Sequence, residues 1–188
     1  MRIKNKNEST KIIEELGLNR LPEVLFAKDF NDAELKRVMD ELGFEYYGIR
    51  NKVQAGVKKR YEDIHKDNVV ASCRESGWEK FSIVPSMRNF GDSQYLVGDI
   101  MVRKDGSVWY TVSRNPSYVP PHAHKDPDFS GVSDVFDPKL KIIRGMKEII
   151  DYVYKHDLVD IIVEFAIFNQ PVGFNKEKIV VWELRTDY

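Results

Sequence analysis

Three charged residues interrupt two apolar stretches near the end of the sequence. Glu164 lies in the run VEFAIF at 163–168, and Glu183 and Arg185 lie in the run KIVVWELR at 178–185. A carboxylate in an apolar strand is costly to bury unless another group pairs with it. Residues two apart on a strand project from the same face, so Glu183 and Arg185 share a surface. Two acids and one base there could hold a metal ion and a polyphosphate, or could form a structural salt-bridge network.

A second group of residues able to do chemistry lies in a stretch rich in Pro, Asp, His and Ser, 116–138. His122 and His124 are two residues apart, and Asp126 and Asp128 follow closely. On an extended segment both imidazoles would face one side, and carboxylates could complete the coordination sphere of a metal. The alternative is that these are ordinary solvent-facing loop residues. A small metal-dependent enzyme that uses His122 and His124 is therefore one functional hypothesis.

The net charge and the cysteine content of the chain limit the kinds of partner that we expect for the protein. The chain has 188 residues, a net charge of −1 and a single cysteine, Cys73. A charge near zero gives no global field that would draw the protein to nucleic acid or to a membrane surface. The basic run at 58–60 is interleaved with acids, which is typical of a solvated helix face. One cysteine allows no intrachain disulfide. We expect a cytoplasmic protein with no membrane span, and we do not expect nucleic acid as a partner.

The elements that must position these residues follow from apolar periodicity and from turn signals. A helix over 7–18 and another over 31–42 each end at a glycine, and Lys104-Asp105-Gly106 joins two strands as a hairpin. A long ordered loop over 116–138 would act as a lid or binding loop. Strands are expected at 23–26, 44–49, 81–85, 95–103 and 107–113, followed by a helix over 139–155 and two closing strands. This mixture predicts an α+β fold.

Four segments, taken in this order, resemble the nucleotide-binding domain of the phosphoenolpyruvate synthase and pyruvate phosphate dikinase family, an ATP-grasp relative. They are STKIIEELG at 9–17 with the following Leu21-Pro22, YGIRN at 47–51, VWYTVSRNPS at 108–117, and VEF at 163–165 with WELR at 182–185. Each segment alone is a weak signal. Their order and approximate spacing agree with the family and together span nearly the whole chain.

The resemblance implies an ATP-grasp-like α+β fold of two small lobes with mixed or antiparallel sheets, approximately 1–80 and 81–188, which form a single unit. It further implies ATP and Mg²⁺ as ligands. Lys11, Arg50 and Arg114 would contact the nucleotide together with Glu183 and Arg185. Glu164 and Glu183 would hold the metal. Arg50 and Arg185 would act in catalysis.

The sequence departs from the family at several points. The family's Arg-Ser-Ser-Ala stretch is here Arg50-Asn51-Lys52-Val53, and Glu183 stands where a glutamine is common. The chain is also shorter than the family's nucleotide-binding domain and lacks a phosphohistidine domain and a pyruvate-binding barrel. We therefore expect an Mg-ATP-binding protein that acts as a phosphotransferase on a small molecule or on a partner protein, which could supply the missing domains. A non-catalytic binding module that retains the fold is the alternative.

Overall fold

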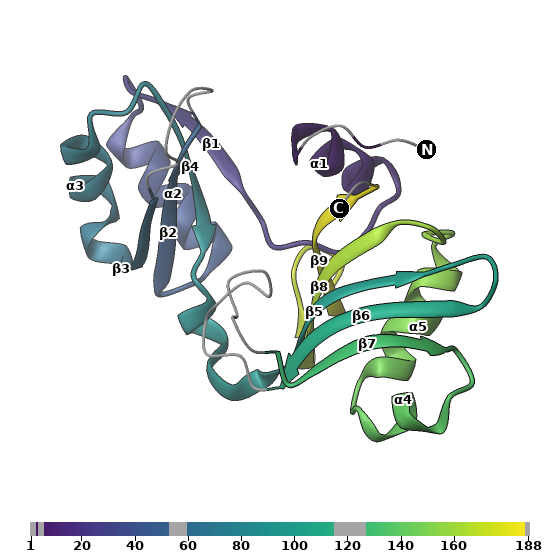
Figure 1. The fold of residues 1–188 in the computed structure, drawn as a ribbon. Coiled ribbons are helices and arrows are strands. Elements are labelled where there is room, and N and C mark those ends of the chain that lie inside the picture. The colour runs from purple at the N-terminus through teal and green to yellow at the C-terminus, as the bar shows by residue number, and fades with distance from the viewer. Residues whose placement is uncertain (1–2, 4–5, 53–59, 115–126, 187–188) are drawn as a thin grey trace. The chain divides into compact units, whose positions relative to one another are not determined.

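Two antiparallel sheets organise the chain, and each belongs to a separate unit (Figure 1). The computed structural model describes residues 3, 6–52, 60–114 and 127–186. The larger unit comprises Met1–Arg20 and Asp92–Tyr188, and the smaller unit comprises Leu21–Gly91. This division differs from the expected lobes 1–80 and 81–188, because the first helix belongs with the C-terminal residues and the boundary follows Gly91.

The smaller unit is a four-stranded sheet with strand order β1-β4-β2-β3. Its elements are β1 (Val24–Ala27), α2 (Asp32–Leu42), β2 (Tyr46–Asn51), β3 (Arg60–His65), α3 (Lys66–Ser76) and β4 (Lys80–Pro85), and the 3-10 helix η1 (Met87–Ser93) follows. Asn31 caps α2 by accepting from the backbone of Ala33 and Glu34. Gly43 ends that helix in the left-handed conformation, with φ of 72°, which glycine adopts without strain.

The core of the smaller unit forms between one face of its sheet and the two helices. Leu35 and Met39 of α2 are four residues apart and buried, and so are Val69 and Cys73 of α3. This spacing places each pair on one side of its helix. The sheet contributes alternating residues from its inner strands, namely Tyr47, Ile49, Phe81 and Ile83.

The larger unit is a five-stranded sheet with strand order β7-β6-β5-β8-β9. Its elements are α1 (Lys6–Glu15), β5 (Gln94–Val102), β6 (Ser107–Arg114), β7 (Phe129–Asp134), α4 (Pro138–Ile142), α5 (Met146–Lys155), β8 (Ile162–Val172) and β9 (Glu177–Arg185). Every neighbouring pair of strands is antiparallel. Among the described residues, no helix is long and apolar enough to cross a membrane.

One face of the five-stranded sheet packs into the core with α5. Met146, Ile149 and Val153 of that helix are fully buried in the same cluster as sheet residues. The sheet residues alternate along their strands, as a half-buried strand requires; on β5 and β8 they are Leu96, Ile100 and Val102, and Val163, Phe165 and Ile167. The residues between them, which include Asp99 and Glu164, therefore lie on the opposite face.

The α+β fold class is confirmed, and several expected elements differ in detail. Residues 60–65 form a strand that sequence analysis did not list, directly after the basic run interpreted as part of a solvated helix face. The loop expected over 116–138 contains the strand Phe129–Asp134. The single helix expected over 139–155 is two helices, because Ile143 is extended and Gly145 adopts a φ of 89°. Ile142, within that helical range, is 81% exposed.

Candidate functional site

Three acidic side chains occupy one row across the five-stranded sheet. Asp99 on β5 lies opposite Glu164 on β8, and Glu164 lies opposite Glu183 on β9. Directly opposed residues of antiparallel strands share a face and have Cβ atoms about 5 Å apart. Asp99 and Glu164 are both 6% exposed, whereas Glu183 is half-buried. We call these three residues the acidic row. Sequence analysis paired Glu164 with Glu183, and the structure places them side by side.

A β-bulge decides which residue of β9 joins the acidic row. Phe165 pairs with Val181, but the next residue along β8, Glu164, pairs with Glu183 rather than with Trp182. One extra residue on β9 therefore shifts the alternation by one position. Glu183 turns to the face that carries Asp99 and Glu164, and Leu184 turns into the core, where it is fully buried.

Arg185 adds a positive charge to the same face. Its Nη2 atom donates a hydrogen bond to Oδ1 of Asp99 at 2.6 Å. The Asp99 side chain is 8% exposed and the Arg185 side chain is 33% exposed, so the ion pair is largely shielded from water. Sequence analysis expected Arg185 to contact the nucleotide and to act in catalysis. The structure identifies Asp99, which that analysis did not single out, as its hydrogen-bond partner.

The acidic row favours the charged form of Arg185. Burial alone would lower the pKa of Arg185, but the negative charges of Asp99, Glu164 and Glu183 raise it above its ordinary value. Three carboxyl groups and one guanidinium therefore share this face of the sheet. Nε of Arg185 is buried and has no hydrogen-bond partner within the described part of the chain. An excess of acid beside an unsatisfied donor is suited to a ligand that combines a cation with oxygen acceptors.

The other residues that were expected to contact the nucleotide are on other elements than the acidic row. Lys11 is on α1, where its side chain is 74% exposed and lies 3.5 Å from Glu15. Arg114 ends β6 in register with the core residue Leu96, which places it on the opposite face from the acidic row. Its guanidinium lies over the ring of Phe129, 4.9 Å from the centroid.

Arg50 belongs to the smaller unit. It is exposed on β2, in register with Arg60 on β3 and Ser82 on β4, on the face that does not pack against the helices. His122 and His124 lie outside the described residues. Within 3, 6–52, 60–114 and 127–186, no group of three or more His, Cys, Asp or Glu side chains is arranged to hold a metal ion. Any cation at the acidic row would therefore need ligands from outside this set of side chains.

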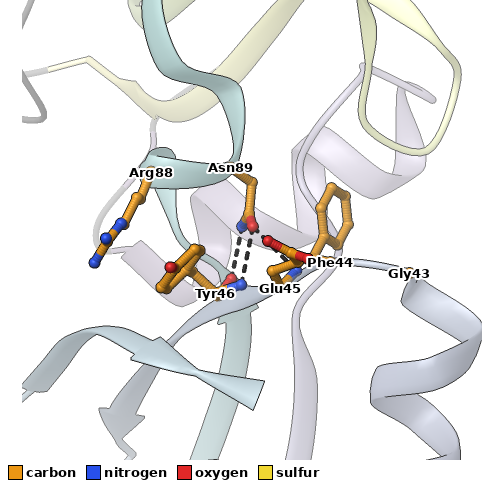
Figure 2. A pocket seen from close by; sticks show the side chains of 6 residues that line it. All are labelled: Gly43, Phe44, Glu45, Tyr46, Arg88 and Asn89. Carbon is orange, nitrogen blue, oxygen red and sulfur yellow. Dashed lines mark hydrogen bonds between the residues drawn. The ribbon is translucent and has the colours of Figure 1, made fainter. Parts of the chain in front are cut away.

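The smaller unit contains an open hollow of about 330 Å³, lined by Gly43, Phe44, Glu45, Tyr46, Arg88 and Asn89 (Figure 2). Asn89 points to the backbone of β2, where its Oδ1 accepts from the Tyr46 amide at 2.9 Å and its Nδ2 donates to the Tyr46 carbonyl at 2.6 Å. Arg88 lies over the ring of Tyr46 at 4.0 Å from the centroid. These contacts join η1 to the four-stranded sheet. The side chains of Arg88 and Asn89 that line the hollow therefore have a structural role.

No family model matches the chain, and no curated protein matches it in sequence. The fold is similar to that of an N5-carboxyaminoimidazole ribonucleotide synthetase solved as an ADP complex, with a TM-score of 0.53, 13% identity, and coverage of 100% of this chain and 45% of that chain. The D-alanyl-alanine synthetase A of Vibrio cholerae O1 biovar eltor gives a TM-score of 0.48, 12% identity, and coverage of 97% and 54%. The ATP-grasp ligase PsnB gives 0.44, 9% identity, and coverage of 96% and 51%.

The chain thus spans about half the length of these proteins. Sequence identities this low carry information on the fold alone. The two antiparallel sheets with their helices form an ATP-grasp-like α+β fold.

Proposed function

We propose that this protein binds ATP together with Mg²⁺ at the acidic row and transfers the γ-phosphoryl group to an acceptor. The observation that carries the proposal is the register that aligns Asp99, Glu164 and Glu183 beside Arg185. An ATP-grasp-like fold supports it, since one protein of similar fold was solved with ADP. The four-segment resemblance to the phosphoenolpyruvate synthase and pyruvate phosphate dikinase family is the narrower form of the same proposal.

The residues of the row are chemically suited to magnesium. Mg²⁺ prefers oxygen ligands and is usually held by one or two carboxylates together with phosphate oxygens and water. Glu164 and Glu183 are adjacent across two strands and are the residues that would hold it. When bound, the ion would neutralise charge on the phosphates. Two carboxylates would be enough in this arrangement, because phosphate oxygens of the nucleotide and water would supply the remaining ligands of the ion.

Arg185 is the residue that we propose for contact with the transferred phosphoryl group. A guanidinium carries five N–H donors, and Asp99 accepts a hydrogen bond from one of its nitrogens. In the transfer, the bond between the γ-phosphorus and its bridging oxygen breaks while a bond to an acceptor oxygen forms, and an acceptor hydroxyl would release its proton to solvent. ADP leaves with the bridging electron pair. Positioning and charge stabilisation provide most of the catalysis in such reactions.

Lys11 and Arg50 remain proposed phosphate contacts, and Arg50 a proposed catalytic residue. Both side chains are exposed, each within its own unit, and a lysine or an arginine is a suitable partner for an anionic ligand. Arg114 suits this role less well because its register places it on the other face of the sheet. The acceptor is proposed to be either a small molecule or a partner protein that supplies further domains.

Thermal unfolding with ATP, with and without Mg²⁺, tests the proposal. A ligand present at 100 times its dissociation constant stabilises the native state by about 2.7 kcal/mol. For a chain of this size the melting temperature should rise by roughly 5–10 °C. Glu183→Ala should abolish the Mg²⁺-dependent rise without loss of the fold, while Asp151→Ala, at an exposed acid on α5, should leave it intact. No rise at millimolar Mg-ATP in the unaltered protein would refute the nucleotide site.

A further inference from the structure

Three polar side chains of the larger unit, two at the end of α5 and one at the start of β9, are incompletely satisfied. The Tyr152 hydroxyl, Nε2 of His156 and Oε2 of Glu177 are all buried, and none has a hydrogen-bond partner among the described residues. Tyr152 and His156 are one helical turn apart, and their ring centroids are separated by 4.3 Å. Glu177 acts electrostatically on both rings. Folded proteins leave few buried polar atoms unsatisfied, so three in one place indicate a special environment.

Asn19 connects this cluster to the closed end of the β8–β9 hairpin. Its Nδ2 atom donates to the carbonyl of Glu177 at 3.2 Å, and its backbone lies near the Tyr152 hydroxyl. Burial raises the pKa of Tyr152 to about 12, although the Asn19 backbone opposes the shift. Tyr152 is only 6% exposed and keeps its proton at neutral pH. The stacked rings therefore lie against the hairpin as uncharged groups.

The surroundings of His156 suit an uncharged ring. A protonated imidazole carries N–H donors on both nitrogens, and Nε2 is buried where the described part of the chain offers no acceptor within hydrogen-bonding geometry. Burial and then the charge of Lys155 lower the pKa of His156, while Glu177 opposes the shift. These are the two charged side chains that act on the ring within the described ranges. Acid would therefore place on the ring a charge that this position stabilises poorly.

We propose that His156 is a pH-sensitive latch, whose uncharged ring holds the C-terminal turn of α5, residues 152–158, against the start of β9 and whose protonation releases that turn into water. Two backbone hydrogen bonds would open on release. They run from the His156 amide to the Tyr152 carbonyl at 3.1 Å and from the Leu158 amide to the Val153 carbonyl at 2.9 Å. The latch does not involve the acidic row and does not depend on a nucleotide.

The expected pH response follows from the linkage between protonation and release. The pKa of the released ring is near its ordinary value of 6.5, and the pKa of the docked ring is lower. The population of the released state should therefore rise as the pH falls from 6.5, by up to about tenfold per pH unit, and should level off below the pKa of the docked ring. Amide hydrogen exchange at residues 156 and 158 reports this population once the intrinsic effect of pH on exchange is removed.

Urea separates local release from global unfolding. Release of one turn exposes little surface, so exchange at residues 156 and 158 should respond weakly to low concentrations of urea. The amide of Ile100, a fully buried residue in the central strand β5, should be better protected and should respond strongly to urea. Equal protection and equal urea dependence at these three amides would show that only global unfolding occurs, and would overturn the proposal.

Four variants identify the charges that set the response. His156→Gln cannot be protonated, so its pH response should disappear. Lys155→Gln removes a repulsive charge and should make the acceleration about twofold smaller, whereas Glu177→Gln removes an attractive charge and should make it about twofold larger, as for partly exposed charges. Lys147→Gln is the matched control, because this exposed lysine of α5 pairs with Asp151 and should leave the response unchanged.

The experiment measures hydrogen exchange by NMR between pH 5 and pH 7 for the unaltered protein and these variants, without nucleotide. Acceleration at residues 156 and 158 in acid, with its loss in His156→Gln, is the expected result. Slower exchange in acid would show that the protonated ring docks better than the neutral ring, for example by pairing with Glu177, and would overturn the latch. A response that persists in His156→Gln would overturn it as well. If that variant does not fold, the same response in Lys155→Gln and Glu177→Gln would refute the role of His156.

Discussion

Asn19 holds the closed end of the β8–β9 hairpin, whose strands carry Glu164 and Glu183, and its replacement by alanine should strongly destabilise the larger unit. The side chain is fully buried. Its Nδ2 atom donates to the carbonyls of Val172 and Ile179, each at 2.9 Å, and approaches the carbonyl of Glu177 at 3.2 Å. Its Oδ1 atom accepts from the Asn175 amide at 2.9 Å.

The size of the effect follows from what alanine would leave behind. The two bonds to Val172 and Ile179 are buried, and a buried carbonyl left without a partner costs about 1–3 kcal/mol. The partly buried bond from Asn175 adds about 1 kcal/mol. Water that enters the space would recover part of this, so we expect a loss of about 3–5 kcal/mol. Small proteins are stable by only about 5–15 kcal/mol, so this loss is a large fraction.

Urea denaturation followed by circular dichroism measures the loss, and hydrogen exchange locates it. Exchange should accelerate first at the amides of Val172–Glu177 in Asn19→Ala. Asn175→Ala is the control. It keeps the hydrogen bond from the backbone amide of residue 175 to Oδ1 of Asn19, and it removes only the exposed bond from the Asn175 side chain to the carbonyl of Gly17. We expect about 1 kcal/mol or less for that change. A loss below about 1 kcal/mol in Asn19→Ala would show that solvent replaces these bonds and that the accounting is wrong.

Two further predictions concern groups buried away from the acidic row. Burial in α3 raises the pKa of the Cys73 thiol to about 12, so the reactive thiolate is scarce in the folded protein. Labelling by a thiol reagent at pH 8 should be at least about 100-fold slower in the native than in the denatured protein, since each unit by which the pKa is raised lowers the thiolate fraction about tenfold; similar rates would contradict this. Burial, followed by the charge of Lys155, lowers the pKa of His156 below 6.5, while Glu177 opposes the shift. The unfolded chain therefore binds the proton more readily, and the free energy of unfolding should fall as the pH drops from 6.5 through the lowered pKa. His156→Gln should flatten that part of a urea-denaturation series against pH, and an unchanged slope would disprove the assignment.

Elements bounded by local signals could be predicted from the sequence. Helix α2 has a capping asparagine before it and a glycine after it, and the structure uses both. The hairpin between β5 and β6 follows from Lys104-Asp105-Gly106 between two apolar runs, and the strands on either side pair in register from Val102 with Val108 onward. In each case, the residues that determine the conformation are close in sequence, so no knowledge of distant contacts is needed.

The strands that sequence analysis missed are both edge strands. β3 lies at one edge of the four-stranded sheet and β7 at one edge of the five-stranded sheet. An edge strand pairs on one side only and can remain largely solvated, so it needs no apolar alternation. The sequence RYEDIH of β3 is mostly exposed, and FSGVSD of β7 alternates between half-buried and exposed positions. The break before α5 is different, because Gly145 within the apolar periodicity was a visible signal for it.

The acidic row was only partly accessible to sequence analysis because its members come from three strands. The signal that identified Glu164, a carboxylate within an apolar run, is equally present at Asp99 in the run LVGDIMV at 96–102. What the sequence could not supply was the pairing of β5 with β8, which are separated by β6, β7 and two helices in the chain. Such contacts depend on the topology of the whole sheet, so Asp99 could be identified as a charged strand residue but not as the partner of Arg185.

The bulge at Trp182 shows why even a correct strand assignment does not determine a site. With regular alternation from the Phe165–Val181 pair, Trp182 would lie opposite Glu164, and Glu183 would lie opposite Val163 on the core face. That arrangement would bury a carboxylate among apolar side chains at a cost of several kcal/mol. The extra residue avoids this cost and also places Leu184 in the core. Burial of the apolar Leu184 and exclusion of the Glu183 carboxylate from the core therefore favour the same register. The same shift brings Arg185 to the face where it bonds to Asp99.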